Sequence, residues 1–187
     1  MSVLHKRHRD AGFGMTELLI VLTMIALIGS LGIGFFRTAA QTLQGDANLR
    51  ILEWQLKLAR EFAINQRRAV EVRFTPPNLI SVVRRNIPNG ETLLSSAVLE
   101  HGTYFLLFTG QPDTPDAFGR AAATDFGGAT ATMFTSDGMF TDQTGNALNG
   151  TVFLGQPGRP MTSRALTVFG PTARIRVYRW NGAQWRH

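Results

Sequence analysis

The sequence contains no cysteine. This absence excludes disulfide bonds, cysteine nucleophiles and thiolate-bound metal ions. The spacings HExxH, GxSxG and the P-loop are also missing, so no common hydrolase or nucleotide-binding motif is present. Three of the four histidines lie near the ends of the chain, and His101 precedes a glycine. We therefore expect a protein that is not an enzyme and carries no cofactor.

Charge is almost absent from one long segment. In residues 13–36, FGMTELLIVLTMIALIGSLGIGFF, the sole charged residue is Glu17. At about 1.5 Å per residue, this run is long enough to cross a hydrocarbon layer of about 30 Å. A carboxylate there costs about 2.5–3.5 kcal/mol on insertion scales, so Glu17 is expected to have a partner or a function. The alternative is that Glu17 lies among the lipid headgroups. We predict a transmembrane helix over residues 13–36.

The residues before this segment carry a specific pattern. A basic leader (HKRHRD) ends at Gly12, Phe13 follows, and Thr-Glu-Leu-Leu-Ile-Val occupies residues 16–21. The pattern resembles the class III signal of type IV pilins and pseudopilins. The resemblance implies that a prepilin peptidase cuts after Gly12 and methylates the new amino terminus, Phe13. It also implies that Glu17 meets the free amino terminus of a neighbouring subunit when the helices bundle into a filament.

Two other kinds of N-terminal segment fit less well. A secretory signal peptide has an apolar core of about 7–15 residues, which is shorter than this run. A plain membrane anchor accounts for the hydrophobicity but not for the combination of Gly12, Phe13 and Glu17. The positive charge of the leader, residues 1–12, predicts that the leader lies in the cytoplasm. The C-terminal domain is then expected outside the cytoplasm. The expected location is the inner (cytoplasmic) membrane, spanned once, with assembly into a pilus or pseudopilus.

Residues 37–68 continue the helix with an amphipathic pattern. The apolar residues that recur at steps of three or four are Leu43, Ala47, Ile51, Trp54, Leu58 and Phe62, with Leu52, Leu56, Ala59 and Ala63 beside them. We expect this stripe to cover a sheet. Glu53 and Lys57 have the spacing of a helical ion pair.

After this helix, apolar and polar residues alternate with a period of two, which is typical of a β-strand. Val70, Val72 and Phe74 are predicted to face one side of a strand, and Glu71 and Arg73 the other. Strands are expected at residues 70–74, 79–84, 93–99, 104–108, 130–135, 151–154, 165–169 and 174–180, with a loop at 111–128. The predicted fold class is α+β and pilin-like: a long N-terminal helix packed on an antiparallel β-sheet domain, residues 69–187.

A second resemblance narrows the family. The helix end, residues 56–63 (LKLAREFA), followed by Asn65 and a strand at Val70, is similar to the GspH/FimT branch of pseudopilins and minor pilins. Phe134-x-x-Asp137-Gly138 resembles a turn of the same branch and also fits a plain hairpin turn. Calcium ligation by Asp137, Asp142 and Asn146 is a weaker alternative, because their spacing fits no EF-hand loop. Without cysteine, the chain departs from the many major pilins that close a C-terminal loop by a disulfide.

The C-terminal part has arginines without acids. No Asp or Glu follows Asp142. If Ile175 and Val177 face the core, the alternate residues of that strand share an outer face, where guanidiniums beside aromatic rings suit phosphate neutralisation and base stacking. The turn Asn181-Gly182 would bring the last residues back to the same edge. The candidate DNA-binding residues are Arg174, Arg176, Tyr178, Arg179, Trp180 and Arg186.

The resemblance gives this strand two interpretations. FimT-like minor pilins bind DNA through a basic C-terminal segment with a Gly-Arg-x-Arg pattern, and here Arg174-Ile-Arg176 is kept while the glycine, Gly170, is displaced. The other interpretation is a solvated or filament-contact face. The chain is thus expected to be a minor pseudopilin or minor pilin of a type II secretion pseudopilus or type IV pilus. Its expected partners are prepilin peptidase, other pilin subunits and the membrane. The alternative is a DNA-binding minor pilin for natural transformation.

Overall fold

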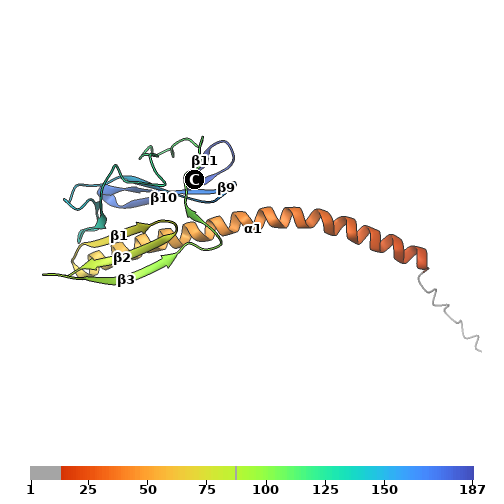
Figure 1. Ribbon diagram of the computed structural model, residues 1–187, viewed down its shortest axis with the longest axis horizontal. Coiled ribbons are helices and arrows are strands. Elements are labelled where there is room, and N and C mark those ends of the chain that lie inside the picture. The colour runs from red at the N-terminus through yellow and green to blue at the C-terminus, as the bar shows by residue number, and fades with distance from the viewer. Residues whose placement is uncertain (1–13, 87) are drawn as a thin grey trace, which may run out of the picture. The chain divides into compact units, whose positions relative to one another are not determined.

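The computed structural model describes residues 14–86 and 88–187, with the side chains of residues 31–41 left aside. The predicted cleavage and methylation site, Gly12 and Phe13, lies outside the described residues. Contacts divide the chain into two compact units, Met1–Ala40 and Gln41–His187. The long helix α1, Met15–Gln66, begins in the first unit and ends in the second (Figure 1).

The first unit presents exposed apolar side chains. Between residues 14 and 30 every described side chain is exposed, including Met15, Leu18 and Ile28. Among the described residues, no helical stretch is long and apolar enough to cross a membrane. The predicted transmembrane segment, residues 13–36, lies partly outside the described residues.

In the second unit, α1 buries one stripe of its surface. The buried apolar residues follow steps of three and four: Leu49, Leu52, Leu56, Ala59 and Ala63. The predicted stripe is therefore partly wrong, because Leu43 is 68% exposed and Trp54 is 57% exposed. The helix carries two adjacent apolar stripes, and the one with small residues lets the strands approach closely. The predicted Glu53–Lys57 ion pair is present, with 2.6 Å between Oε1 and Nζ.

The first sheet contains five antiparallel strands in the order β3-β2-β1-β6-β7. Val70 and Val72 of β1 are buried against the core, as the alternation predicts. Glu71 lies on the opposite face, in register with Val83 of β2 and Met133 of β6. The strand bounds are β1 Val70–Thr75, β2 Leu79–Arg85, β3 Glu91–Val98, β6 Thr132–Phe134 and β7 Phe140–Thr141.

The second sheet follows the order β11-β10-β9-β8-β4, with β5 paired to β8. A short 3-10 helix, η1 Gly170–Thr172, joins β9 to β10. The predicted C-terminal turn is confirmed, because Trp185 pairs with Trp180 and Arg186 with Arg179. The strand bounds are β4 Tyr104–Phe105, β5 Thr124–Asp125, β8 Gly150–Gln156, β9 Arg159–Phe169, β10 Arg174–Trp180 and β11 Trp185–Arg186.

One hydrophobic core joins the buried stripe of α1 to both sheets. It includes Val72 and Ile80 of the first sheet and Val152 and Leu166 of the second. In Figure 1, β1, β2 and β3 lie on one side of the helix, and β9 and β10 on another. The two sheets therefore depend on the same helix for their burial.

The Phe134-x-x-Asp137-Gly138 segment forms the hairpin turn between β6 and β7. The Gly138 N–H donates to the Thr135 carbonyl, and Gly138 has a φ of 81°, which glycine adopts without strain. Phe134 is fully buried on one side of the turn. At the following turn, Asp142 Oδ1 accepts hydrogen bonds from the backbone N–H groups of Thr144 and Asn146. The Asp142 carboxylate thus organises a turn.

Candidate functional site

The C-terminal strand β10 has the alternation that the sequence predicts. Ile175 and Val177 pack against the main core. Tyr178 lies on the other side of the strand, in a second hydrophobic cluster with Phe153, Ala165 and Trp185. The second face of β10 is therefore covered rather than open to solvent.

This burial corrects the predicted role of Tyr178. The side chain is 3% exposed, so it is not available to stack on a base. Trp180 is half-buried and lies edge-on against Trp185, with 5.2 Å between ring centroids. Trp185 is held in turn by its Nε1–H, which donates to the Pro112 carbonyl at 2.9 Å. The loop after β4 and the final turn thus cover the face that the strand alone seemed to expose.

Asp116, from that loop, binds three side chains of β9 and β10. Its carboxylate lies 2.6 Å from Arg176 Nη1, and it accepts hydrogen bonds from the Thr167 hydroxyl at 2.6 Å and the Tyr178 hydroxyl at 2.9 Å. Burial raises the pKa of Asp116, but the hydrogen bonds from Thr167, Tyr178 and Arg176 outweigh it and hold that pKa below its ordinary value. Burial and the bond to Asp116 raise the pKa of Tyr178. The charge of Arg176 is therefore already neutralised.

Asp46 of α1 binds two further arginines. Arg164 of β9 is 1% exposed, and its Nε lies 2.7 Å from Asp46 Oδ1. Arg179 Nη2 lies 2.9 Å from Asp46 Oδ2. Arg164 also donates to the carbonyls of Thr42, Met161 and Ser163, so most of its donors are used. This cluster fixes the helix to the second sheet.

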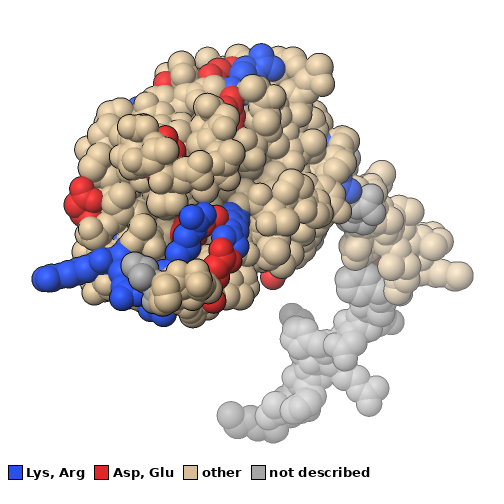
Figure 2. Space-filling model, turned by 60° about the vertical axis from the view of Figure 1, so that its left-hand side comes forward, with Lys and Arg blue, Asp and Glu red and all other residues tan. Residues whose placement is uncertain are grey.

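Three of the predicted arginines are exposed: Arg179, which Asp46 binds, and Arg174 and Arg186. Arg174 lies over the Phe169 ring, 5.6 Å from its centroid, and Arg186 lies on β11. Neither has an ion-pair partner among the described residues. On the face that Figure 2 shows, basic and acidic side chains lie intermingled, and most of the remaining surface is uncharged. The predicted set of six residues does not form one free basic surface, because Tyr178 is buried and Arg176 and Arg179 are bound to carboxylates.

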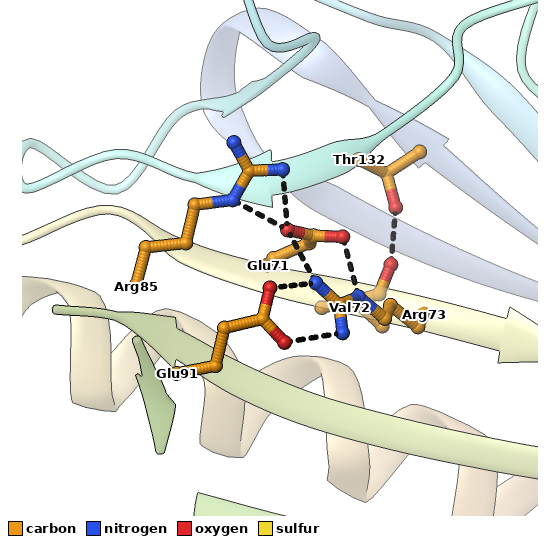
Figure 3. Close-up of polar contacts among 6 residues, drawn as sticks. All are labelled: Glu71, Val72, Arg73, Arg85, Glu91 and Thr132. Carbon is orange, nitrogen blue, oxygen red and sulfur yellow. Dashed lines mark hydrogen bonds and ion pairs between the residues drawn. The ribbon is translucent and has the colours of Figure 1, made fainter. Parts of the chain in front are cut away.

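A second charged cluster lies on the outer face of the first sheet (Figure 3). Glu71 is 6% exposed and binds Arg73 Nε at 2.6 Å and Arg85 Nη2 at 2.9 Å. Arg73 also binds Glu91 through two hydrogen bonds of 2.5 and 2.7 Å. Burial raises the pKa of Glu71, but Arg73 and Arg85 outweigh it and hold that pKa below its ordinary value. The sequence signal for this cluster was the alternation of opposite charges on strands that pair.

A cleft of about 530 Å³ lies beside this cluster. Residues 71–75 of β1 line one side, and residues of the 121–132 segment line the other. The Thr132 hydroxyl donates to the Val72 carbonyl at 2.7 Å (Figure 3). Asp125, in the same cleft, accepts the backbone N–H groups of Ala121 and Gly127. Its carboxylate is therefore used to hold the loop.

Glu17 lies in the first turn of α1 and is exposed. Its side chain has no partner among the described residues. Its predicted partner, the amino terminus at Phe13 of another subunit, is not part of this structure. The role of Glu17 therefore stays a prediction.

Comparisons with known proteins identify the fold. No protein-family model matches the sequence, and no curated protein matches it either. Among solved structures, the chain is similar to the minor pseudopilin EpsH from the Type 2 Secretion System of Vibrio cholerae, with a TM-score of 0.50 and 14% sequence identity. The likeness covers 73% of this chain and 97% of the EpsH chain. The chain therefore has a pseudopilin-like fold, which confirms the predicted α+β class.

Proposed function

We propose that the chain is a minor pseudopilin, a structural and non-catalytic subunit of a type II secretion pseudopilus. The observation that carries the proposal is the likeness to EpsH, which extends over 97% of that minor pseudopilin. The class III signal at residues 12–21 supports the same assignment independently, because it is a sequence pattern that lies outside the domain, Gln41–His187. A type IV pilus is the related assembly that the same signal allows.

The N-terminal part of α1 would anchor the subunit. Its apolar side chains are exposed, and such a surface is covered by lipid or by other helices in a working protein. The exposed set includes Met15, Leu18, Leu19, Ile20, Leu22, Met24, Ile25, Leu27 and Ile28. In this proposal the helix spans the inner membrane before assembly and joins the filament core afterwards. The domain, Gln41–His187, then lies outside the cytoplasm.

Processing by prepilin peptidase is the first step to test. The chain is produced with and without the peptidase, and its intact mass is measured. We expect loss of residues 1–12 and addition of a methyl group at Phe13 only when the peptidase is present. Gly12→Ala, which keeps a small residue, serves as a mild variant, and Gly12→Phe as a blocking one. An uncut wild-type chain beside a cleaved known substrate would refute the pseudopilin assignment.

Assembly is tested through Glu17. Glu17→Gln removes the charge while keeping the shape, and Glu61→Gln is a control at an exposed residue of the same helix. We expect Glu17→Gln to prevent crosslinking of the chain into the filament while processing at Gly12 continues. Equal crosslinking of both variants would mean that Glu17 does not pair with a neighbouring amino terminus.

DNA binding is the second candidate, and one observation favours it. Arg174, at the start of β10, and Arg186, which pairs with Arg179 near the other end of β10, are exposed and lack ion-pair partners among the described residues. Binding would then be salt-dependent and would weaken in the Arg174→Ala, Arg186→Ala double variant. Arg120→Ala, also an exposed arginine, is the control. Absence of binding at low salt would exclude a DNA-receptor role.

A further inference from the structure

The edges of the two sheets are not alike. Among the described edge strands, β4, β5, β7 and β11 are each two residues long. The remaining one, β3, has eight residues, Glu91–Val98, and its backbone pairs only with β2 among the described strands. After Glu91, β3 contains no charged residue and no proline. Long edges of this kind are normally blocked by charge or proline, because they pair readily with another chain.

An open groove runs between this edge and the helix. It has a volume of about 510 Å³ and lies entirely within the second unit. The helix contributes Ile51 and Trp54, and β3 contributes Ala97 and Val98. Trp54 is 57% exposed and Val98 is 53% exposed. An exposed tryptophan beside an apolar strand is typical of a residue that anchors a partner.

A buried polar group in the groove wall lacks a hydrogen-bond donor. Gln55 lines the groove and is 2% exposed, and its Oε1 has no hydrogen-bond partner among the described residues. A buried carbonyl oxygen without a donor is unfavourable, and such groups are rare in folded proteins. A ligand that supplies an N–H group would satisfy this oxygen after a small rotation of the amide.

The charges at the rim indicate what kind of chain fits. Arg50 is exposed and has no ion-pair partner among the described residues, so an acidic group of the ligand would neutralise it. Glu100 lies at the β3 end of the groove. A second copy of β3 would not supply such an acidic group, because its one acidic residue is Glu91, which Arg73 already binds through two hydrogen bonds. The unpaired Arg50 therefore argues against a second copy as the occupant.

We propose that β3 and this groove bind an extended strand from a different protein chain. The strand would form backbone hydrogen bonds with the free edge of β3 and place apolar side chains, at alternate positions on the helix side, against Trp54. One of its N–H groups would reach Gln55, and a carboxylate would meet Arg50. The inference does not rest on the pseudopilin assignment, because it uses only the geometry of the domain.

The test starts from a displayed library of random peptides of about nine residues, long enough to span an eight-residue strand. The full-length chain in detergent micelles is the target. We expect the selected peptides to alternate apolar residues and to carry an acidic one. Their binding should slow amide hydrogen exchange in residues 92–98. Failure to select any peptide that protects β3 would overturn the proposal.

Variants then distinguish binding in the groove from non-specific binding to exposed apolar residues. Trp54→Ala should weaken the selected peptide by at least about tenfold, as for a tryptophan anchor. Met161→Ala, at a residue with a similar exposure of 54%, is the matched control and should change nothing. Ser96→Lys, at an exposed position of β3, should block the edge without disturbing the fold. Equal binding by the Trp54 and Met161 variants would refute the groove.

A modified peptide tests the role of the backbone. The selected peptide is remade with N-methyl groups at alternate residues, in both registers, so that one version lacks the N–H groups that face β3. We expect that version alone to lose binding. Retention by both versions would show side-chain contact without strand addition and would overturn the proposal. Self-association of the chain that the peptide competes away would instead assign the groove to a second copy.

Discussion

The first and second sheets hold their arginines in different ways. In the first sheet, Glu71 binds Arg73, two residues away on the same strand, and Arg85, 14 residues away on the next strand. In the second sheet, Asp116 binds Arg176 across 60 residues, and Asp46 binds Arg164 across 118 residues. The cluster of the first sheet is thus built from three consecutive strands, β1, β2 and β3, whereas the clusters of the second sheet are formed by segments that meet only when the whole domain folds.

Burial sets one of these arginines apart. Arg73 and Arg85 have exposed side-chain fractions of 37% and 55%, and Arg176 and Arg179 of the second sheet have 39% and 58%, whereas Arg164 is at 1%. Water screens the arginines of the first sheet and stabilises them if a partner is lost. Arg164 is buried, so water cannot solvate its charge if a partner is lost. Ion pairs with similar distances therefore have unequal importance for stability, and the variants below rank them.

Removal of one partner of the Asp46–Arg164 pair should have the largest effect. Asp46→Ala leaves a buried guanidinium without a counter-charge, which costs about 3–5 kcal/mol. Urea unfolding of the compact unit, Gln41–His187, followed by circular dichroism, measures the loss. Arg164→Met is the companion variant, because it fills a similar volume and leaves Asp46 paired with Arg179. A smaller loss for Arg164→Met than for Asp46→Ala is expected, and the reverse order would contradict the account.

The Asp116 and Glu71 clusters should come next, with Asp116 the more sensitive. Asp116→Asn keeps the shape but removes the charge that binds Arg176, and should cost about 1–3 kcal/mol. Glu71→Gln should cost less, because Arg73 retains Glu91 and Arg85 is largely hydrated. The same unfolding measurement compares the two. Equal losses would mean that Glu91, the second partner of Arg73, does not compensate for the loss of the Glu71 charge.

Acid should destabilise the domain through the same two carboxylates. The folded-state pKa values of Glu71 and Asp116 lie below the ordinary values of 4.5 and 3.8. A lowered pKa in the folded state means that the stabilisation is complete above the ordinary value and is lost as the pH falls through the folded one. Unfolding free energy should therefore decline below about pH 5. The decline should be shallower in the Asp116→Asn variant; an unchanged slope would exclude Asp116 as a contributor.

The surface pair Glu53–Lys57 should have the smallest effect. Lys57 has an exposed side-chain fraction of 62%, and pairs of this spacing contribute about 0.3–0.5 kcal/mol. Lys57→Ala should therefore shift the urea midpoint barely beyond error, and added salt should remove the difference. If Lys57→Ala lowers the free energy of unfolding as much as Glu71→Gln does, burial does not explain the importance of these ion pairs for stability.

The sequence predicted the parts of this domain that depend on local order. The bounds of β10, the return of Trp185 to Trp180 and the turn at Gly138 follow from alternation and turn residues. The sequence did not predict β5, β7 and β11, which are two residues long. Residues 104–108, expected as a buried strand, form only the half-buried β4.

The candidate site was harder to predict because its partners are distant in sequence. Alternation correctly assigned Tyr178 to the face opposite Ile175, but nothing local indicates that Asp116 covers that face. The helix poses a similar problem. Leu52 and Trp54 belong to adjacent apolar stripes, and only the position of the sheets decides which stripe is buried.

The placement of the three tryptophans gives the domain an intrinsic spectroscopic signal. Trp180 and Trp185 lie at 5.2 Å with their planes inclined by 63°, a geometry in which two indole transitions couple and give a paired circular-dichroism signal. Trp54, exposed on the helix, lies outside that pair. The dichroism of the Trp180–Trp185 pair therefore reports closure of the β10–β11 edge in an unlabelled sample.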